Sequence, residues 1–160
     1  METKRCRIQV LNQDDYEDVK RVYFDNRVRK FLGGIVSIER YNDNFNEMIN
    51  STDGSLYWVV RLKSTNDFIG LISIDKHHDG VYQELSYQFV PDYWGNGYAL
   101  ETTKEILYFA SKELKIKKIV SETQVVNKSS CTLLNKLGMK IIDQVYRFNA
   151  EQYIFELELE

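Results

Sequence analysis

Seven stretches of the chain have the alternating or strand-like pattern of apolar and polar residues that is typical of β-strands. The seven expected strands are residues 5–11, 56–63, 68–76, 81–90, 118–124, 140–148 and 152–159. Short segments rich in turn-forming residues separate the second, third and fourth stretches, at residues 64–67 and 78–80. Because turns of this length join antiparallel neighbours, we expect these three strands to form a meander.

Four stretches have helix-boundary residues or apolar residues at helical spacing. Asn12 precedes a turn rich in Asp and Glu, as a helix N-terminus prefers, and Gly138 stands where a left-handed C-cap is expected. The four expected helices are residues 12–26, 37–50, 98–114 and 127–137. No linker, repeat or low-complexity tract interrupts this order, which predicts one mixed α/β domain over residues 1–160.

Composition and charge exclude several classes of function. A net charge of −3 provides no general attraction for nucleic acid. The two cysteines, Cys6 and Cys131, are far apart, which excludes a disulfide scaffold and suits a reducing compartment. The start of the chain, METKRCRIQVL, lacks the apolar segment of a signal peptide, and no apolar run approaches the roughly 20 residues that cross a bilayer. We therefore expect a cytoplasmic protein without nucleic-acid or membrane partners.

The segment VPDYWGNGYALETTKE (residues 90–105) holds the only proline of the chain and two of its eight glycines. Gly95 and Gly97 lie between the end of a predicted strand and the start of a predicted helix. Without side chains there, a ligand can lie on the backbone, and the free N–H groups of the helix N-terminus favour an anion. The segment therefore predicts either a phosphate-binding turn or a plain turn that needs the conformational freedom of glycine.

Two common nucleotide-binding motifs do not fit this segment. A dinucleotide-binding G-x-G-x-x-G would need a third glycine where Leu100 stands, and it would need parallel strands in place of the expected meander. A P-loop needs Gly-Lys followed by Ser or Thr, and the chain has no Gly-Lys pair. A phosphate bound here would belong to another class of site.

A second motif, NKSSCTLLNKLGMK (residues 127–140), follows a predicted strand and opens a helix. Together with WGNGYA (residues 94–99) and the order of elements, it resembles the GNAT superfamily of acyl-CoA-dependent N-acetyltransferases. Gly97-Tyr98-Ala99 matches the end of the family's acetyl-CoA motif Q/R-x-x-G-x-G/A, while Trp94 stands where Arg or Gln is usual. With tryptophan at this position, the segment resembles the RimJ/RimL-type branch of the family, whose founding members acetylate protein N-termini.

The later family motif, N-x-x-A-x-x-L-Y-x-x-x-G-F, is matched by Asn127, Leu133 and Gly138, with Ser130 at the alanine position and Met139 at the phenylalanine. The resemblance covers nearly the whole chain. It implies the GNAT-like fold, a mixed and mostly antiparallel central sheet of about seven strands flanked by about four helices. It also implies transfer of the acetyl group of acetyl-CoA to a primary amine, by direct attack in a ternary complex.

The resemblance further implies where acetyl-CoA binds. Main-chain amides of the glycine turn are expected to hold the pyrophosphate, and the preceding strand is expected to hold the pantetheine arm beside a gap to strand 118–124. Asn127 has two readings, a contact to the cofactor or a helix N-cap, and both can hold. The expected cofactor-binding residues are Phe89, Val90, Trp94, Gly95, Asn96, Gly97, Tyr98, Ala99, Asn127 and Ser130.

The catalytic residues are less well determined. Many family members protonate the leaving thiolate with a tyrosine in the later motif, where this chain has Leu134. Ser130 is the best substitute because its spacing puts it on the apolar face of its helix, although such a serine can also bond its own backbone. Glu84 is the first candidate for the general base, and the alternative is a solvated strand carboxylate. His77 and His78 are expected to be exposed turn histidines.

The acceptor pocket is expected between the first two helices. The expected substrate-binding residues are Arg29, Phe31, Leu32, Tyr41 and Glu84. They do not distinguish a protein N-terminus from a small-molecule amine. No His, Cys, Asp or Glu cluster has metal-ligand spacing in the sequence, so no metal is expected, and aromatic residues in 146–155 are expected in the sheet core. The last strand could pair between subunits of a homodimer.

Two alternatives to an enzyme remain open at this point. The first is an acyl-CoA-binding domain without catalysis, which the missing tyrosine would explain. The second is an interaction domain in which the glycines only make turns. Stabilisation by acetyl-CoA without turnover would indicate the first, and absence of stabilisation would indicate the second.

Overall fold

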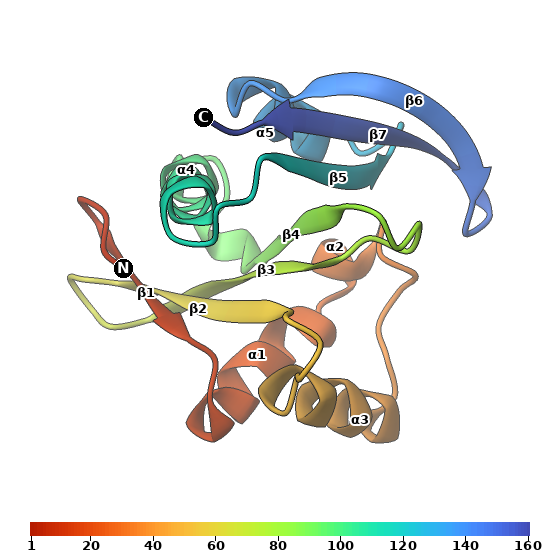
Figure 1. The fold of residues 1–160 in the computed structure, drawn as a ribbon. Helices are drawn as coiled ribbons and strands as arrows, with labels where there is room; N and C mark the ends of the chain where they lie inside the picture. The colour runs from red at the N-terminus through yellow and green to blue at the C-terminus, as the bar shows by residue number, and fades with distance from the viewer.

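The computed structural model describes residues 1–160, and its seven strands form one sheet in the order β1-β2-β3-β4-β5-β7-β6 (Figure 1). The strands are β1 Cys6–Val10, β2 Leu56–Leu62, β3 Phe68–Lys76, β4 Gln83–Phe89, β5 Lys118–Gln124, β6 Lys140–Arg147 and β7 Ala150–Glu158. Every expected strand is present, and β2, β3 and β4 form the predicted antiparallel meander. The fold class inferred from the sequence is therefore confirmed.

The structure has five α-helices where the sequence predicted about four. They are α1 Tyr16–Tyr23, α2 Asn26–Arg29, α3 Ile38–Ile49, α4 Tyr98–Lys112 and α5 Lys128–Lys136. The expected first helix is divided: Asn12 caps a 3₁₀ turn, Gln13–Asp15, that leads into α1. Asp25 then ends the helical run, because its side chain accepts hydrogen bonds from the N–H groups of Arg27 and Val28 and caps a separate α2.

The helices cover the two faces of the sheet unequally. In Figure 1, α1, α2 and α3 lie on one side of the sheet, and α4 and α5 lie on the other. Each side has its own apolar core. The core under α4 and α5 includes Ile72, Leu85, Ile106, Leu134 and Phe155. The core under α1 and α3 includes Val19, Val22, Tyr41, Phe45 and Phe68. Burial of the apolar faces of α1, α3, α4 and α5 holds both layers on the sheet.

The β4–β5 contact is the one parallel pairing in the sheet, and it is very short. Only Gln83↔Ile119 and Glu84↔Val120 are paired. The hydroxyl of Ser121 donates a hydrogen bond to Leu85 O at 2.9 Å, and no ladder continues beyond that point. The two strands therefore separate toward Phe89 and leave a gap in the middle of the sheet.

Two expectations about the C-terminal strands, an exposed last strand and buried aromatic residues, are wrong in whole or in part. β7 is paired with β5 on one side and with β6 on the other, so residues 152–159 do not form an exposed edge, and β6 is the edge strand. Phe155 is buried, but Tyr146 and Phe148 are 68% and 73% exposed, so these two aromatic residues lie outside the sheet core. No helix is long and apolar enough to cross a bilayer.

Candidate active site

The glycine turn lies beside the gap between β4 and β5. Gly95 and Gly97 have φ angles of 74° and 79°, a left-handed conformation that strains other residues. α4 begins at Tyr98, where the spacing of apolar residues placed it, and Gly97 precedes it as an N-cap without a side-chain hydrogen bond. A Cβ built on Gly95 would meet no heavy atom within 4 Å, so this side of the turn is open. The N–H groups of the first helical turn are therefore available for an anion.

Trp94 and Arg5 hold this turn from two directions. The indole Nε1 of Trp94 donates to Phe89 O at 2.7 Å, which ties the turn to the end of β4. Arg5 Nη1 donates to Asn96 O at 2.9 Å, its Nε pairs with Glu101 at 2.7 Å, and its guanidinium carbon lies 4.2 Å from the centre of the Tyr98 ring. Sequence reasoning missed Arg5 because it lies 91 residues from Asn96 and in no motif.

The backbone at the end of β4 is only partly available to a ligand. Val90 N–H donates to Ile69 O at 2.9 Å, so this group is used within the sheet, and the expectation that it would hold the pantetheine arm is wrong. Alternate residues of a strand direct their backbone groups to opposite sides, so those of Phe89 face the gap. Phe89 O already accepts the indole bond, which leaves the N–H of Phe89 as the donor toward the gap.

Ser130 and Tyr87 meet at the other wall of the gap. The Ser130 hydroxyl lies 2.8 Å from the Tyr87 hydroxyl, and Asn127 Oδ1 accepts the Ser130 N–H at 3.2 Å as the cap of α5. The structure therefore gives Ser130 a partner in β4 in place of its own backbone. Burial raises the pKa of Tyr87 above its usual range, so its hydroxyl keeps its proton at neutral pH. Leu134, at the family's tyrosine position, is fully buried in the core.

Glu84 stands at the last paired position before β4 and β5 separate. Burial raises the pKa of Glu84 to about 7; the positive charge of His77 lowers it, and the negative charges of Asp75 and Glu122 raise it further. A carboxylate with a pKa near neutrality has the properties of a general base at physiological pH. Burial therefore excludes the solvated strand carboxylate, and the role of Glu84 as a base stays a prediction.

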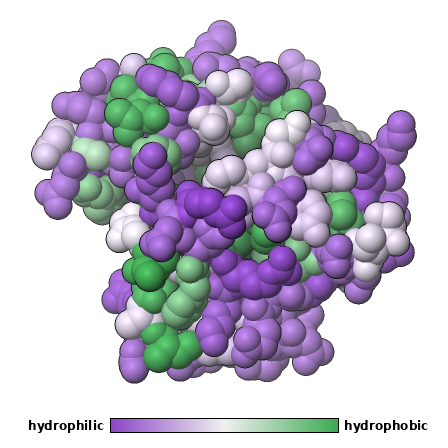
Figure 2. All heavy atoms as spheres, turned by 180° about the vertical axis from the view of Figure 1, so that it is seen from behind, coloured by the Kyte–Doolittle hydropathy of each residue, from purple (hydrophilic) through white to green (hydrophobic).

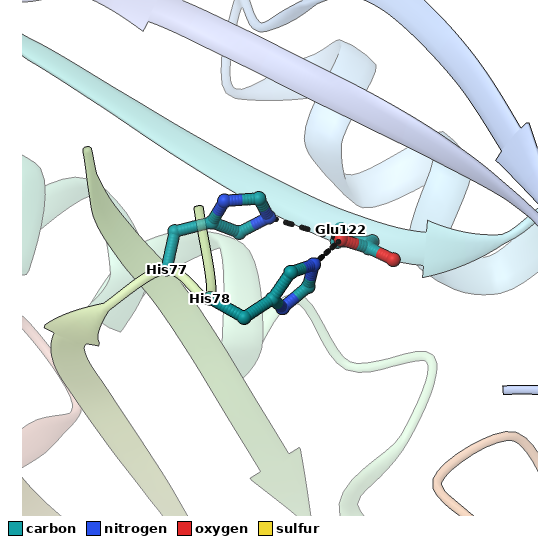
Figure 3. Close-up of side chains that lie close together, drawn as sticks. All are labelled: His77, His78 and Glu122. Carbon is teal, nitrogen blue, oxygen red and sulfur yellow. Dashed lines mark hydrogen bonds and ion pairs between the residues drawn. The ribbon is translucent and has the colours of Figure 1, made fainter. Parts of the chain in front are cut away.

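The sequence predicted two exposed turn histidines, and this is confirmed for His78 but wrong for His77. His77 is 2% exposed, because its ring turns inward from the end of β3 and places Nε2 3.0 Å from Glu122 Oε2 (Figure 3). The side chain of His78 is 39% exposed, yet its Nε2 also lies 3.3 Å from Glu122 Oε2. Arg147 donates two hydrogen bonds of 2.7 Å to the same carboxylate.

The loop after α2 crosses the gap from the α1 side. Arg29 donates to Gly34 O at 2.9 Å and to Leu32 O at 2.7 Å, and it reaches Gln88 of β4 at 3.3 Å. Phe31 O accepts from the side chain of Gln124 in β5 at 3.3 Å, so the loop contacts both separated strands. Leu32 is 44% exposed beside them.

Tyr41, the last of the residues predicted for the acceptor pocket, is not on that surface. It is fully buried under α1, and its hydroxyl donates to Tyr16 O at 2.6 Å. The prediction of a substrate contact for Tyr41 is wrong, because the apolar face of α3 turns it into the core.

The family model described as "Acetyltransferase (GNAT) domain" matches residues 5–140 of this chain. The chain belongs to this GNAT family. It is similar to the Bacillus subtilis (strain 168) protein named "Uncharacterized N-acetyltransferase YnaD", with 28% identity over 86% of this chain and 81% of that protein.

Solved structures show the same fold. The Bacillus anthracis acetyltransferase (GNAT family) has a TM-score of 0.85 at 23% identity, over 99% of this chain and 97% of that one. Spermidine N-acetyltransferase from Vibrio cholerae, solved in complex with CoA and spermine, has a TM-score of 0.81 at 14% identity. The likeness covers 96% of this chain and 95% of that one. This GNAT chain thus shares its sheet and helices with acetyltransferases, and at these identities the likeness concerns the fold.

Residues that fit a CoA-type ligand are present in this GNAT chain. An open left-handed turn, a helix N-terminus without a side-chain cap and an N–H that faces a gap in the sheet converge at the end of β4. The surface seen from behind is mostly hydrophilic, with apolar residues in separate groups (Figure 2). This face therefore has no continuous apolar patch of the kind that marks a protein-binding surface.

Proposed function

We propose that this GNAT chain is an acetyl-CoA-dependent N-acetyltransferase of the RimJ/RimL-like type that acts on a primary amine in the cytoplasm. The observation that carries the proposal is the separation of β4 and β5 directly beside the Gly95–Gly97 turn at the start of α4. A diphosphate at the turn and an extended arm along Phe89 would place a thioester in the gap. The complex of the Vibrio cholerae neighbour with CoA and spermine supports this class of ligands.

Backbone groups supply most of the proposed cofactor contacts. The N–H groups at the start of α4, from Gly97 onward, would hold the pyrophosphate through hydrogen bonds and the helix dipole. Trp94 keeps the turn against β4 and leaves Phe89 N–H as the donor to the pantetheine arm. Asn127 stays a helix cap, and its contribution would be to place Ser130.

The proposed chemistry needs one proton acceptor and one proton donor. Acetyl-CoA supplies a thioester carbonyl that an amine attacks. Glu84, with its pKa near 7, would accept the proton of the incoming ammonium group, and the Ser130–Tyr87 pair would donate a proton to the departing sulfur. Arg29, Phe31 and Leu32 would wall the amine side, because their loop contacts both separated strands.

Thiol release from acetyl-CoA tests the proposal. Purified protein should release CoA thiol with at least one member of a panel of N-terminal peptides, polyamines and amino acids, and acetyl-CoA should raise its melting temperature. Stabilisation without release over the whole panel would support an acyl-CoA-binding domain without catalysis, for which the replacement by Leu134 is the favouring observation. Absence of both stabilisation and thiol release would refute acetyl-CoA binding and would support an interaction domain in which the glycines only make turns.

A further inference from the structure

We propose that His77, His78 and Glu122 bind a divalent transition-metal ion such as Zn²⁺, independently of the acetyl transfer. The two imidazoles come from the end of β3 and the turn after it, and the carboxylate comes from β5 (Figure 3). One ligand atom of each residue lies within 4.8 Å of the other two. The site would join the β3–β4 hairpin to β5 next to Glu84↔Val120, the last pair before these strands separate.

The two distances from Glu122 Oε2 to the histidine nitrogens fit tetrahedral coordination. Zn²⁺ bound at about 2.0 Å by imidazole nitrogen and carboxylate oxygen requires ligand atoms that lie about 3.3 Å from one another. Glu122 Oε2 lies 3.0 Å from His77 Nε2 and 3.3 Å from His78 Nε2. Two imidazoles and one carboxylate leave a fourth position for water, and the exposed side of His78 provides access to it.

The hydrogen bonds around His77 leave its Nε2 suited to a cation. His77 Nδ1 lies 2.8 Å from Asp79 Oδ2, so Nδ1 carries the proton that this carboxylate accepts. Burial lowers the pKa of His77, but its hydrogen bonds to Glu122 and Asp79 raise it overall, so without a metal ion a proton on Nε2 is held against Glu122 Oε2 at 3.0 Å. A carboxylate that orients a metal-binding histidine through its other nitrogen is a common outer ligand of metal sites. A metal ion between Nε2 and Oε2 would take the place of that proton and bind both atoms.

The number of donors around Glu122 leads to the same conclusion. Its Oε2 has two lone pairs, and Arg147 Nη2 occupies one of them with a hydrogen bond of 2.7 Å. Protonated Nε2 atoms of both histidines would place two further donors on the single lone pair that remains. One metal ion bound to both Nε2 atoms needs only that lone pair. The charge of Arg147 also competes with the metal, so its removal should strengthen binding.

Titration of tag-free protein with Zn²⁺ and Co²⁺ tests the proposal, and the design benefits from a chain with only two histidines. We expect one equivalent of Zn²⁺ by calorimetry, the visible absorption of four-coordinate Co²⁺, and a higher melting temperature with Zn²⁺. His78→Gln should weaken binding at least tenfold while leaving the metal-free melting temperature unchanged, because this side chain is partly exposed.

Two further variants keep the test decisive. Cys131→Ser should bind as the wild type does, which excludes a thiol site, and Arg147→Gln should bind more tightly. The proposal is overturned if Zn²⁺ binds no better to the wild type than to the His77→Gln/His78→Gln double variant, or if Cys131→Ser loses the ion. An imidazolium–carboxylate network without metal predicts that first result, with no Zn²⁺-dependent change in melting temperature.

Discussion

The hydroxyl of Tyr87 in β4 lies 2.8 Å from the hydroxyl of Ser130 in α5, across the gap where the sheet divides. The family's tyrosine position in α5 is occupied by a buried leucine, Leu134. A phenol is nevertheless present at this wall, and it comes from the strand in place of the helix. Because the two hydroxyls share one hydrogen bond, we infer that they act as a unit toward the departing thiolate.

Removal of either hydroxyl should therefore slow the chemical step. We expect Ser130→Ala and Tyr87→Phe each to lower kcat by about 10² with little change in the KM for acetyl-CoA, since general acid catalysis contributes this much or more. The double variant should be no slower than the more affected single variant. Steady-state thiol release measures both constants. Tyr146→Phe is the control because that side chain is 68% exposed, and independent, multiplicative losses would contradict the shared role.

Glu84 should impose an acid limb on the pH profile. Its pKa is raised to about 7, so kcat/KM should rise with pH through about 7 as the carboxylate loses its proton. Its neighbours that carry charge are Asp75 from β3, His77 after β3 and Glu122 from β5. The folded pKa lies above the unfolded value of about 4.3. The contribution of Glu84 to the free energy of unfolding is therefore full below about pH 4.3 and is lost as pH rises to about 7.

Glu84→Gln isolates this effect. The variant should lose most of its activity and the acid limb near pH 7, while Glu113→Gln, at an exposed position, should keep the wild-type profile. Measurements in EDTA keep a metal ion near Glu122 from changing the charge around Glu84. An acid limb that persists unchanged in Glu84→Gln would assign the base to another group.

The glycine turn allows a matched test of cofactor binding. Gly95 and Gly54 have φ angles of 74° and 89°, and a Cβ built on either meets no heavy atom within 4 Å. Aspartate should therefore strain both positions alike, by about 1–2 kcal/mol. Only at Gly95 should it also place a negative charge beside the diphosphate. Gly95→Asp should weaken acetyl-CoA binding at least tenfold by calorimetry and Gly54→Asp should not; equal affinities would remove the turn from the site.

Local sequence signals predicted the fold and the turn well. Tyr98 begins α4, Asn127 caps α5 and Gly138 ends it in a left-handed conformation with φ 86°. Each of these features depends on a few neighbouring residues, so a local pattern is enough to reveal it. The meander could be predicted from the sequence for the same reason, because its strands are joined by short turns.

Features that depend on distant partners were missed. The sequence predicts an exposed His77 because it adjoins Asp79-Gly80, but its ring contacts Glu122, which is remote in sequence and is bound in turn by Arg147. The resemblance predicts a pocket position for Tyr41, although helical spacing with Phe45 turns both residues into the core. Such pairings arise from sheet order and helix packing, which one local stretch of sequence does not contain.

The last prediction concerns the close contact between Gly70 of β3 and the ring of Phe89. A Cβ built on Gly70 would lie 2.5 Å from Cδ1 of the Phe89 ring, far inside van der Waals contact. Gly70→Ala should displace this ring, destabilise the fold by about 1–3 kcal/mol and weaken acetyl-CoA binding, because the backbone of Phe89 borders the gap. Denaturant unfolding and calorimetry measure the two effects. In a Phe89→Leu background, whose smaller side chain leaves room for the new methyl group, Gly70→Ala should cost less in stability. An equal cost in both backgrounds would show that the ring is not what Gly70 accommodates.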